Sequence, residues 1–298
     1  MSHIQVRKLI EGTYLFAGRH WWYEFKALPK LFENAAIEKL YISLDSQYAK
    51  LTKHWNDDRH SEWITRLFMS LKMVLSASVM LESLLYAKEK NLRIANTYLE
   101  YYSLLTSLRS LLFVLPNCSW NNGKLIKMSH SKAINVAADV LSNLDAAFAE
   151  KLKKYMLRLK AYREFISYRA PSSGERSLRK EQDFDLVNVC RMFVELAQLH
   201  SEIIETSFLK NVNGEFNIAE ETMKHVFESC IDGNCFIDDE DSYRFGYIIR
   251  KHPIPVNIRQ MMSEGHVEDF FGSWCADTQG DEDIFNPDEN CGIIFDVP

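Results

Sequence analysis

The sequence predicts an all-α protein, a multi-helix bundle with extra N-terminal helices and a small irregular C-terminal region. Residues that interrupt helices are scarce, because the 298 residues include only 11 Gly and 7 Pro. Apolar residues also recur at helical spacing through the middle of the chain, as at Trp63, Leu67 and Leu71. β-structure has little support beyond a short strand expected near residues 13–16.

Start and stop signals divide the chain into helices. Asn56 and the two residues after it supply an N-cap for the longest helix, and Pro116 ends the next one. The Pro-Ser-Ser-Gly run at 171–174 breaks the chain further on. The predicted helices span residues 29–54, 60–90, 94–115, 131–144, 146–168, 184–209 and 219–227. We therefore predict an N-terminal region with one packing helix at 1–58, a helical bundle at 59–210 and a small C-terminal region at 211–298.

Charge is divided unevenly along the chain, whose net charge is −6. Residues 236–298 carry 14 Asp/Glu and 4 Lys/Arg, a balance of −10, whereas residues 1–235 carry 27 and 31, a balance of +4. The sequence thus predicts a mildly basic body and an acidic tail. Because the tail ends in apolar residues, two interpretations are open. Either it docks on the basic face of its own bundle or of a neighbouring molecule, where it mimics nucleic acid, or it is a loose solvated tail.

The sequence favours a cytoplasmic protein that does not cross a membrane. Its longest apolar run, at 111–116, is far shorter than the roughly 20 residues that a membrane-spanning helix needs. The first residues also lack the continuous apolar segment of a secretory signal. We expect the six cysteines to be mostly reduced thiols.

One segment, residues 151–182, is strongly basic within this acidic protein. It holds ten Lys/Arg against three Asp/Glu, with tyrosines between the cations. Such a strip is typical of a surface that tracks a phosphate backbone and stacks bases on aromatic rings. The candidate ligand-binding residues are Lys154, Arg158, Tyr162, Arg163 and Arg169. The alternative is a solvated helix face whose tyrosines belong to the core.

Three segments in this order resemble a known family. They are YYSLLTSLRSLL at 101–112, KLIKMSHSKAI at 124–134 and YREFISYRAPSSG at 162–174. Together they are similar to the HEPN proteins (higher eukaryotes and prokaryotes nucleotide-binding) over about residues 75–205. The resemblance implies a four-helix core and usually a dimer. It also implies a role in toxin–antitoxin or antiviral defence systems, in which many members cut RNA.

The same resemblance places Arg109, His130 and Arg163 at matching positions. It implies RNA or another phosphate-bearing ligand as partner, a homo- or hetero-oligomer, and a protein partner as a further expectation. Arg109 also has a second interpretation, because an Arg at the edge of a bundle can extend past Leu residues or pair with an acid such as Glu100.

Catalysis in the HEPN family generally uses an Arg followed four to six residues later by a His. Within 75–205 the nearest case is Arg191 and His200, whose spacing is too long. Arg259 and His266 have the fitting spacing but lie outside the matching segments. If the protein is an enzyme, we expect a metal-independent endoribonuclease that uses Arg259 and His266, or another Arg–His pair. The alternative is a non-catalytic interaction subunit that oligomerises or regulates a partner enzyme.

No cofactor and no metal is predicted. Cys230, Cys235 and Cys275, with His252, are of the residue types that bind zinc. Their spacing is looser than that of a zinc knuckle, so the zinc site is only an alternative.

Overall fold

The computed structural model describes residues 15–16, 19–20, 23–174, 178, 184–275 and 284–297. Within these residues it contains eleven helices and two short two-stranded antiparallel sheets, so the predicted all-α, multi-helix class is confirmed. The elements are β1 (Leu15–Phe16), β2 (Arg19–His20), α2 (Leu28–Leu31), α3 (Asn34–Thr52), α4 (Asp57–Glu89), α5 (Arg93–Val114), α6 (His130–Ser142), α7 (Ala146–Arg169), α8 (Leu186–Asn211), α9 (Glu220–Phe227), β3 (Glu228–Ile231), β4 (Asn234–Ile237), α10 (Asp239–Lys251), α11 (Ile258–Met261) and α12 (Glu264–Gly272).

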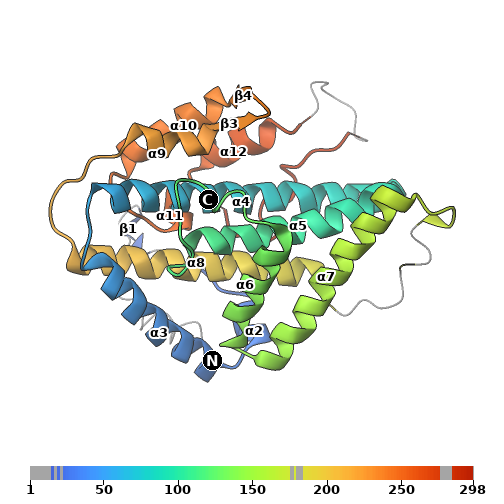
Figure 1. The fold of residues 1–298 in the computed structure, drawn as a ribbon, viewed down its shortest axis with the longest axis horizontal. Helices are drawn as coiled ribbons and strands as arrows, with labels where there is room; N and C mark the ends of the chain where they lie inside the picture. Colours follow the sequence, from blue (N-terminus) through green and yellow to red (C-terminus); the bar gives the residue numbers. More distant parts are fainter. Residues whose placement is uncertain are drawn as a thin grey trace.

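The helices form a central layer with other helices on both sides (Figure 1). In the central layer α5 packs along both α4 and α8. On one side lie α3, α6 and α7, and on the other lie α9, α10 and α12 with the β3–β4 hairpin. One continuous apolar core runs from Tyr23 to Phe295, so the C-terminal region shares the core of the bundle.

Helix α4 is the centre of the molecule. It is long and apolar enough to cross a membrane by length and composition, but 72% of its most apolar window is buried against the other elements. Asn56 caps its start, as predicted, by accepting a hydrogen bond from the Arg59 amide. In its first half the buried Arg66 donates to the backbone carbonyls of Phe113 and Leu115. A buried guanidinium therefore satisfies the carbonyls at the end of α5.

The helix predicted at 29–54 is two helices, because the backbone is extended at Phe32 and Glu33 between α2 and α3. The start of α2 is held from a distant part of the chain. The buried carboxylate of Glu195 on α8 accepts hydrogen bonds from the backbone amides of Lys26, Ala27 and Leu28. A carboxylate at these amides favours the start of a separate short helix there.

The C-terminal region contains a helix that the sequence analysis did not identify. The side chain of Asp238 caps α10 by accepting from the Asp241 amide, and the helix ends on Arg250 and Lys251. Acidic residues at the start and basic residues at the end complement the helix dipole. The predicted helix at 219–227 is present as α9.

The described part of the tail, residues 284–297, is neither solvated throughout nor placed on α7. Phe295 is buried and stacks on Tyr23, with ring centroids 4.6 Å apart. Arg191 donates to the carbonyl of Ile293 at 2.6 Å, and Asp296 pairs with Lys26 at 2.8 Å. The apolar end of the tail therefore completes the core. The acidic residues at 277 and 281–283 lie outside the described residues.

Candidate anion-binding site

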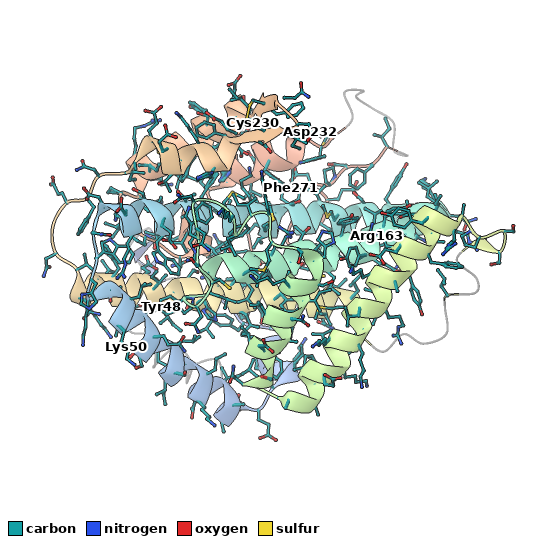
Figure 2. The ribbon with its side chains drawn as sticks, viewed as in Figure 1. Tyr48, Lys50, Arg163, Cys230, Asp232 and Phe271 are labelled. Atoms are coloured by element: carbon teal, nitrogen blue, oxygen red, sulfur yellow. A yellow bond between two sulfur atoms is a disulfide. The ribbon has the colours of Figure 1, made fainter. Side chains whose placement is uncertain are left out.

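Three residues predicted from the family resemblance come together where α5, α6 and α7 meet. Arg109 lies on α5, His130 begins α6 and Arg163 lies on α7, at its crossing with α5 (Figure 2). Both guanidinium groups act electrostatically on the imidazole. We call this group of side chains the α5–α7 cluster; its members are Tyr101, Tyr102, Arg109, His130, Lys160 and Arg163.

Arg109 holds the loop that leads into α6. Its two terminal nitrogens donate to the carbonyls of Ile126 and Met128 at 2.7 and 2.9 Å. Burial lowers the pKa of the guanidinium, but an Arg stays charged at neutral pH. Arg109 therefore does more than extend past Leu residues or pair with an acid. It holds the backbone two residues before His130 and adds a positive charge there.

His130 is an uncharged imidazole surrounded by cations. Burial lowers its pKa, and the charges of Arg109, Arg163 and Lys160 lower it further. Its Nδ1 lies 2.8 Å from the Tyr101 hydroxyl, whose own pKa burial raises to about 12. In the tautomer in which the phenol donates to Nδ1, the ring proton is on Nε2, where it can donate to an anion.

Arg163 lies over two aromatic rings and has an unused donor. Its guanidinium carbon is 5.5 Å from the ring centre of Tyr101 and 5.9 Å from that of Tyr102. Its Nε is buried with no hydrogen-bond partner, although 14% of the side chain is exposed. A buried N–H without an acceptor is costly, so this donor is suited to an incoming oxygen.

The cluster has an excess of positive charge. Arg109, Lys160 and Arg163 are cationic, and the carboxylate beside them is Glu164, which lies 3.7 Å from Lys160 and 3.4 Å from Arg163. Three positive charges and one negative charge leave a balance of +2 around a neutral imidazole. Such a balance favours an anionic ligand.

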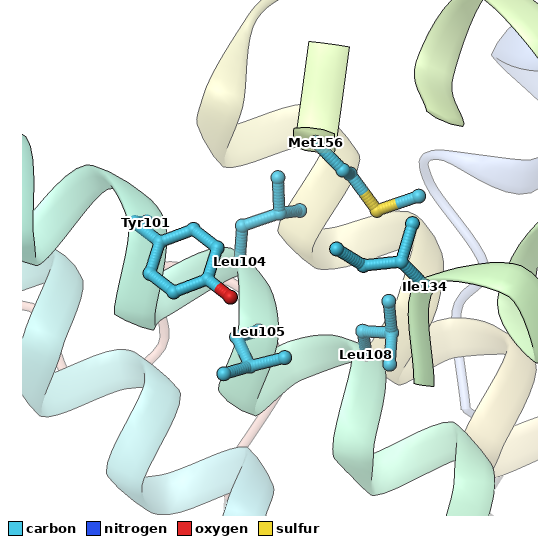
Figure 3. A pocket seen from close by; sticks show the side chains of 6 residues that line it. All are labelled: Tyr101, Leu104, Leu105, Leu108, Ile134 and Met156. Carbon is cyan, nitrogen blue, oxygen red and sulfur yellow. The ribbon is translucent and has the colours of Figure 1, made fainter. Parts of the chain in front are cut away.

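The small cavity beside Tyr101 is not a ligand site. It lies between α5, α6 and α7 and is lined by Tyr101, Leu104, Leu105, Leu108, Ile134 and Met156 (Figure 3). Its volume is about 10 Å³, which is close to the least that a single water molecule needs. Because its lining is apolar, this cavity is a packing gap. A ligand of the α5–α7 cluster would therefore bind on the solvent side of the cluster and not in this cavity.

The other predicted binding residues of α7 lie outside the cluster. Arg158 packs over the Tyr155 ring, Tyr162 packs against the core, and Lys154 pairs with Glu150 at 3.3 Å. Arg169 is exposed at the end of the helix.

Helical geometry explains this division. Arg158 precedes Arg163 by five residues, and at about 100° per residue their directions differ by roughly 140°. Lys160, which the sequence analysis did not select, is three residues from Arg163 and shares its face. The spacing of Lys160 from Arg163 is the signal that could have found it.

Arg259 and His266 lie in different surroundings. Arg259, on α11, has Asp296 and Tyr23 as charged or polar neighbours, and burial lowers its pKa to about 10. His266, on α12, stacks on Phe68, and burial lowers its pKa to about 4. Their action as one catalytic pair stays a prediction without geometric support.

The alternative zinc site with Cys230, Cys235 and Cys275 as ligands is wrong. Cys230 and Cys235 form a disulfide across the β3–β4 hairpin, so neither is a thiolate ligand. The expectation of mostly reduced cysteines holds for Cys118, Cys190, Cys275 and Cys291, which are free, but not for this pair. Within the described residues there is no group of three His, Cys, Asp or Glu side chains placed to hold a metal ion.

Comparison of the chain with protein-family models, with curated proteins and with solved structures gave no match. The similarity to HEPN proteins therefore stays a prediction that depends on the three sequence segments.

Proposed function

We propose that this protein binds RNA at the α5–α7 cluster, as the resemblance to defence-associated HEPN proteins suggests. The observation that carries the proposal is the balance of +2 beside the neutral His130. Phosphate oxygens are the natural acceptors for guanidinium groups, which can contact them through two nitrogens. The unpartnered Nε of Arg163 adds a donor that phosphate can satisfy.

We base the choice of a polymer over a small phosphate on exposed aromatic residues near the end of α7, which lie on a different face of the helix from Arg163. Phe165 and Tyr168 are both exposed, and Arg169 ends the helix next to them. Exposed aromatic rings beside cations suit stacking of unpaired bases while the cations contact the backbone. Single-stranded RNA is therefore the ligand class that we propose.

RNA cleavage without a metal ion is the catalytic extension of the proposal. An imidazole that is neutral at pH 7 can exchange a proton with a 2′-hydroxyl or a leaving oxygen. The guanidinium of Arg163 beside it can stabilise charge that develops on the phosphate. Geometry thus favours His130 with Arg163 as the Arg–His pair, in place of Arg259 and His266. Intact RNA after incubation with the protein in EDTA would leave binding as the function.

Two charge reversals on the same helix test the binding. Arg163→Glu changes the cluster, whereas Lys154→Glu changes an exposed cation outside it. Measured by fluorescence anisotropy with a labelled single-stranded RNA, Arg163→Glu should weaken binding at least about tenfold and lower the salt dependence by about one phosphate contact. Lys154→Glu should change affinity much less.

Two results would count against the proposal. Equal losses for the two variants would indicate nonspecific attraction to a basic helix rather than a site. Competition by millimolar inorganic phosphate as effective as competition by RNA would indicate a small phosphate ligand instead. Circular dichroism of both variants checks that the helical fold is retained.

A second candidate function is that of a non-catalytic subunit that oligomerises or regulates a partner enzyme. The exposed β3–β4 hairpin favours this function. Both strands are exposed on both faces and present Ile231, Phe236 and Ile237 to solvent. Exposed apolar residues grouped on one short hairpin are typical of protein contacts. If this face forms an oligomer, Phe236→Ser with Ile237→Ser should lower the molar mass measured by light scattering without changing RNA affinity.

A further inference from the structure

We propose that the cleft between α4, α10 and α12 binds a small organic cation that carries N–H donors, such as a guanidinium or an amine. The cleft has a volume of about 440 Å³, within the usual range of ligand pockets. Helices α10 and α12, which line it together with α4, lie on the side of α4 opposite α6 and α7 (Figure 1), so the proposal does not depend on RNA binding at the α5–α7 cluster.

The charges of the cleft favour a cation. Four carboxylates line it, from Asp238, Glu240, Asp241 and Asp269, against the two cations Lys72 and Arg244, a balance of −2. Both cations already have ion-pair partners, because Lys72 pairs with Asp241 and Arg244 pairs with Asp269. Among the residues that the structure describes, no ion pair involves Asp238 or Glu240. Asp238 already caps α10 by accepting from the Asp241 amide, so Glu240 is the carboxylate that is placed to accept from a ligand.

A buried imidazole supplies an independent observation. His266 lines the cleft, is only 6% exposed and stacks on the ring of Phe68. Its Nδ1 is buried with no hydrogen-bond partner. A buried polar atom without a partner is costly and calls for a partner that the protein does not provide. An N–H group of a ligand would be that partner, because a neutral imidazole nitrogen can accept.

Aromatic side chains that line the cleft fit the same ligand. Trp274, which is 59% exposed, and Phe270 line the cleft next to the carboxylates. The face of an indole ring attracts a cation, and a planar guanidinium also stacks on it. A metal ion fits less well, since within the described chain no three His, Cys, Asp or Glu side chains converge to hold one.

The experiment uses the full chain and four probes in isothermal titration calorimetry at 0.15 M salt. Agmatine and spermidine carry N–H donors, tetramethylammonium is a cation without them, and inorganic phosphate is an anion. We expect agmatine or spermidine to bind more tightly than 1 mM, and the other two to bind at least about tenfold more weakly. Binding of phosphate in the cleft, or no binding of either amine below about 10 mM, would overturn the proposal.

Exposed residues provide the variants, so folding is not at risk. Glu240→Gln and Trp274→Ala each alter the cleft and should each weaken amine binding about five- to tenfold. Glu268→Gln is the matched control, because Glu268 is an exposed carboxylate of α12 that does not line the cleft. It should change affinity less than twofold. An equal effect of Glu240→Gln and Glu268→Gln would mean general attraction to an acidic surface and would refute the site.

Discussion

Replacement of Glu205 by Gln should stabilise the protein at alkaline pH and not at acid pH. Glu205 lies on α8, is 1% exposed and accepts hydrogen bonds at Oε2 from the backbone and side-chain nitrogens of Asn257, at 3.1 and 2.9 Å. Burial raises its pKa to about 8, although the two hydrogen bonds lower it. The folded protein therefore holds a carboxylic acid at neutral pH, and the amide of Gln has nearly the same shape and can accept the same two bonds.

The magnitude follows from the linkage between protonation and folding. The unfolded chain releases this proton near pH 4.5, whereas the folded chain keeps it until about pH 8. Between these values the folded state binds more protons, so each pH unit costs about 1.4 kcal/mol of stability. Over the 3.5 units between 4.5 and 8 the loss sums to about 5 kcal/mol. The stabilising contribution of the protonated group is fully present below pH 4.5 and is lost as the pH rises to 8.

Denaturant unfolding at pH 5, 6, 7 and 8 measures this contribution as a difference between Glu205→Gln and the unmodified protein. Other titrating groups cancel in that difference, including His200, whose pKa burial lowers to about 3. The difference should grow by about 1.4 kcal/mol per pH unit. Glu215→Gln, at an exposed loop carboxylate, is the control and should give a flat difference. A flat difference for Glu205→Gln as well would refute the reasoning.

Three further predictions follow from contacts of the loops and hairpin. Arg109→Met should cost about 2–4 kcal/mol in denaturant unfolding and weaken RNA binding, because two carbonyls lose a charged donor; unchanged stability would contradict its role in holding the loop. Gly123→Ala should destabilise the protein by at least about 1 kcal/mol, because φ is +76° and a Cβ would lie 2.7 Å from Nδ1 of His225. Thermal unfolding of this variant with and without His225→Ala separates the backbone strain from the clash with His225. Reduction of the Cys230–Cys235 disulfide should leave the melting temperature within a few degrees, because the hairpin that it closes is exposed on both faces; a large drop in calorimetry would show that the hairpin supports the core.

Most helices of the bundle could be predicted because their signals are local. Asn56 and Asp145 cap α4 and α7 through their own side chains, and Pro116 follows the end of α5. The start of α2 could not be predicted, because the carboxylate that holds it is that of Glu195, more than 160 residues away in the chain. The missed α10 differs, since Asp238 and the acids after it are a start signal that was readable.

The candidate site could likewise be predicted only in part, because some of its signals are local and others depend on how the helices pack. The resemblance selected Arg109, His130 and Arg163 one from each helix, and packing of those helices brings them together. Charge density along α7 selected Lys154 as well, but it does not tell which face of the helix meets its neighbours. Only the packing of α7 against α5 decides that Arg163 lies over Tyr101 and that Lys154 is exposed.

The two proposed sites should be separable because they have opposite charge and lie on opposite sides of the central layer. The α5–α7 cluster has a balance of +2, and the cleft over α4 has a balance of −2. Between them are the buried helices α4 and α5, and interactions between exposed charges fade beyond about 8 Å at physiological salt. Arg163→Glu should therefore leave amine binding unchanged, and Glu240→Gln should leave RNA binding unchanged. If Arg163→Glu strengthened amine binding and Glu240→Gln strengthened RNA binding, the cause would be the net charge of the whole protein, and neither site would stand.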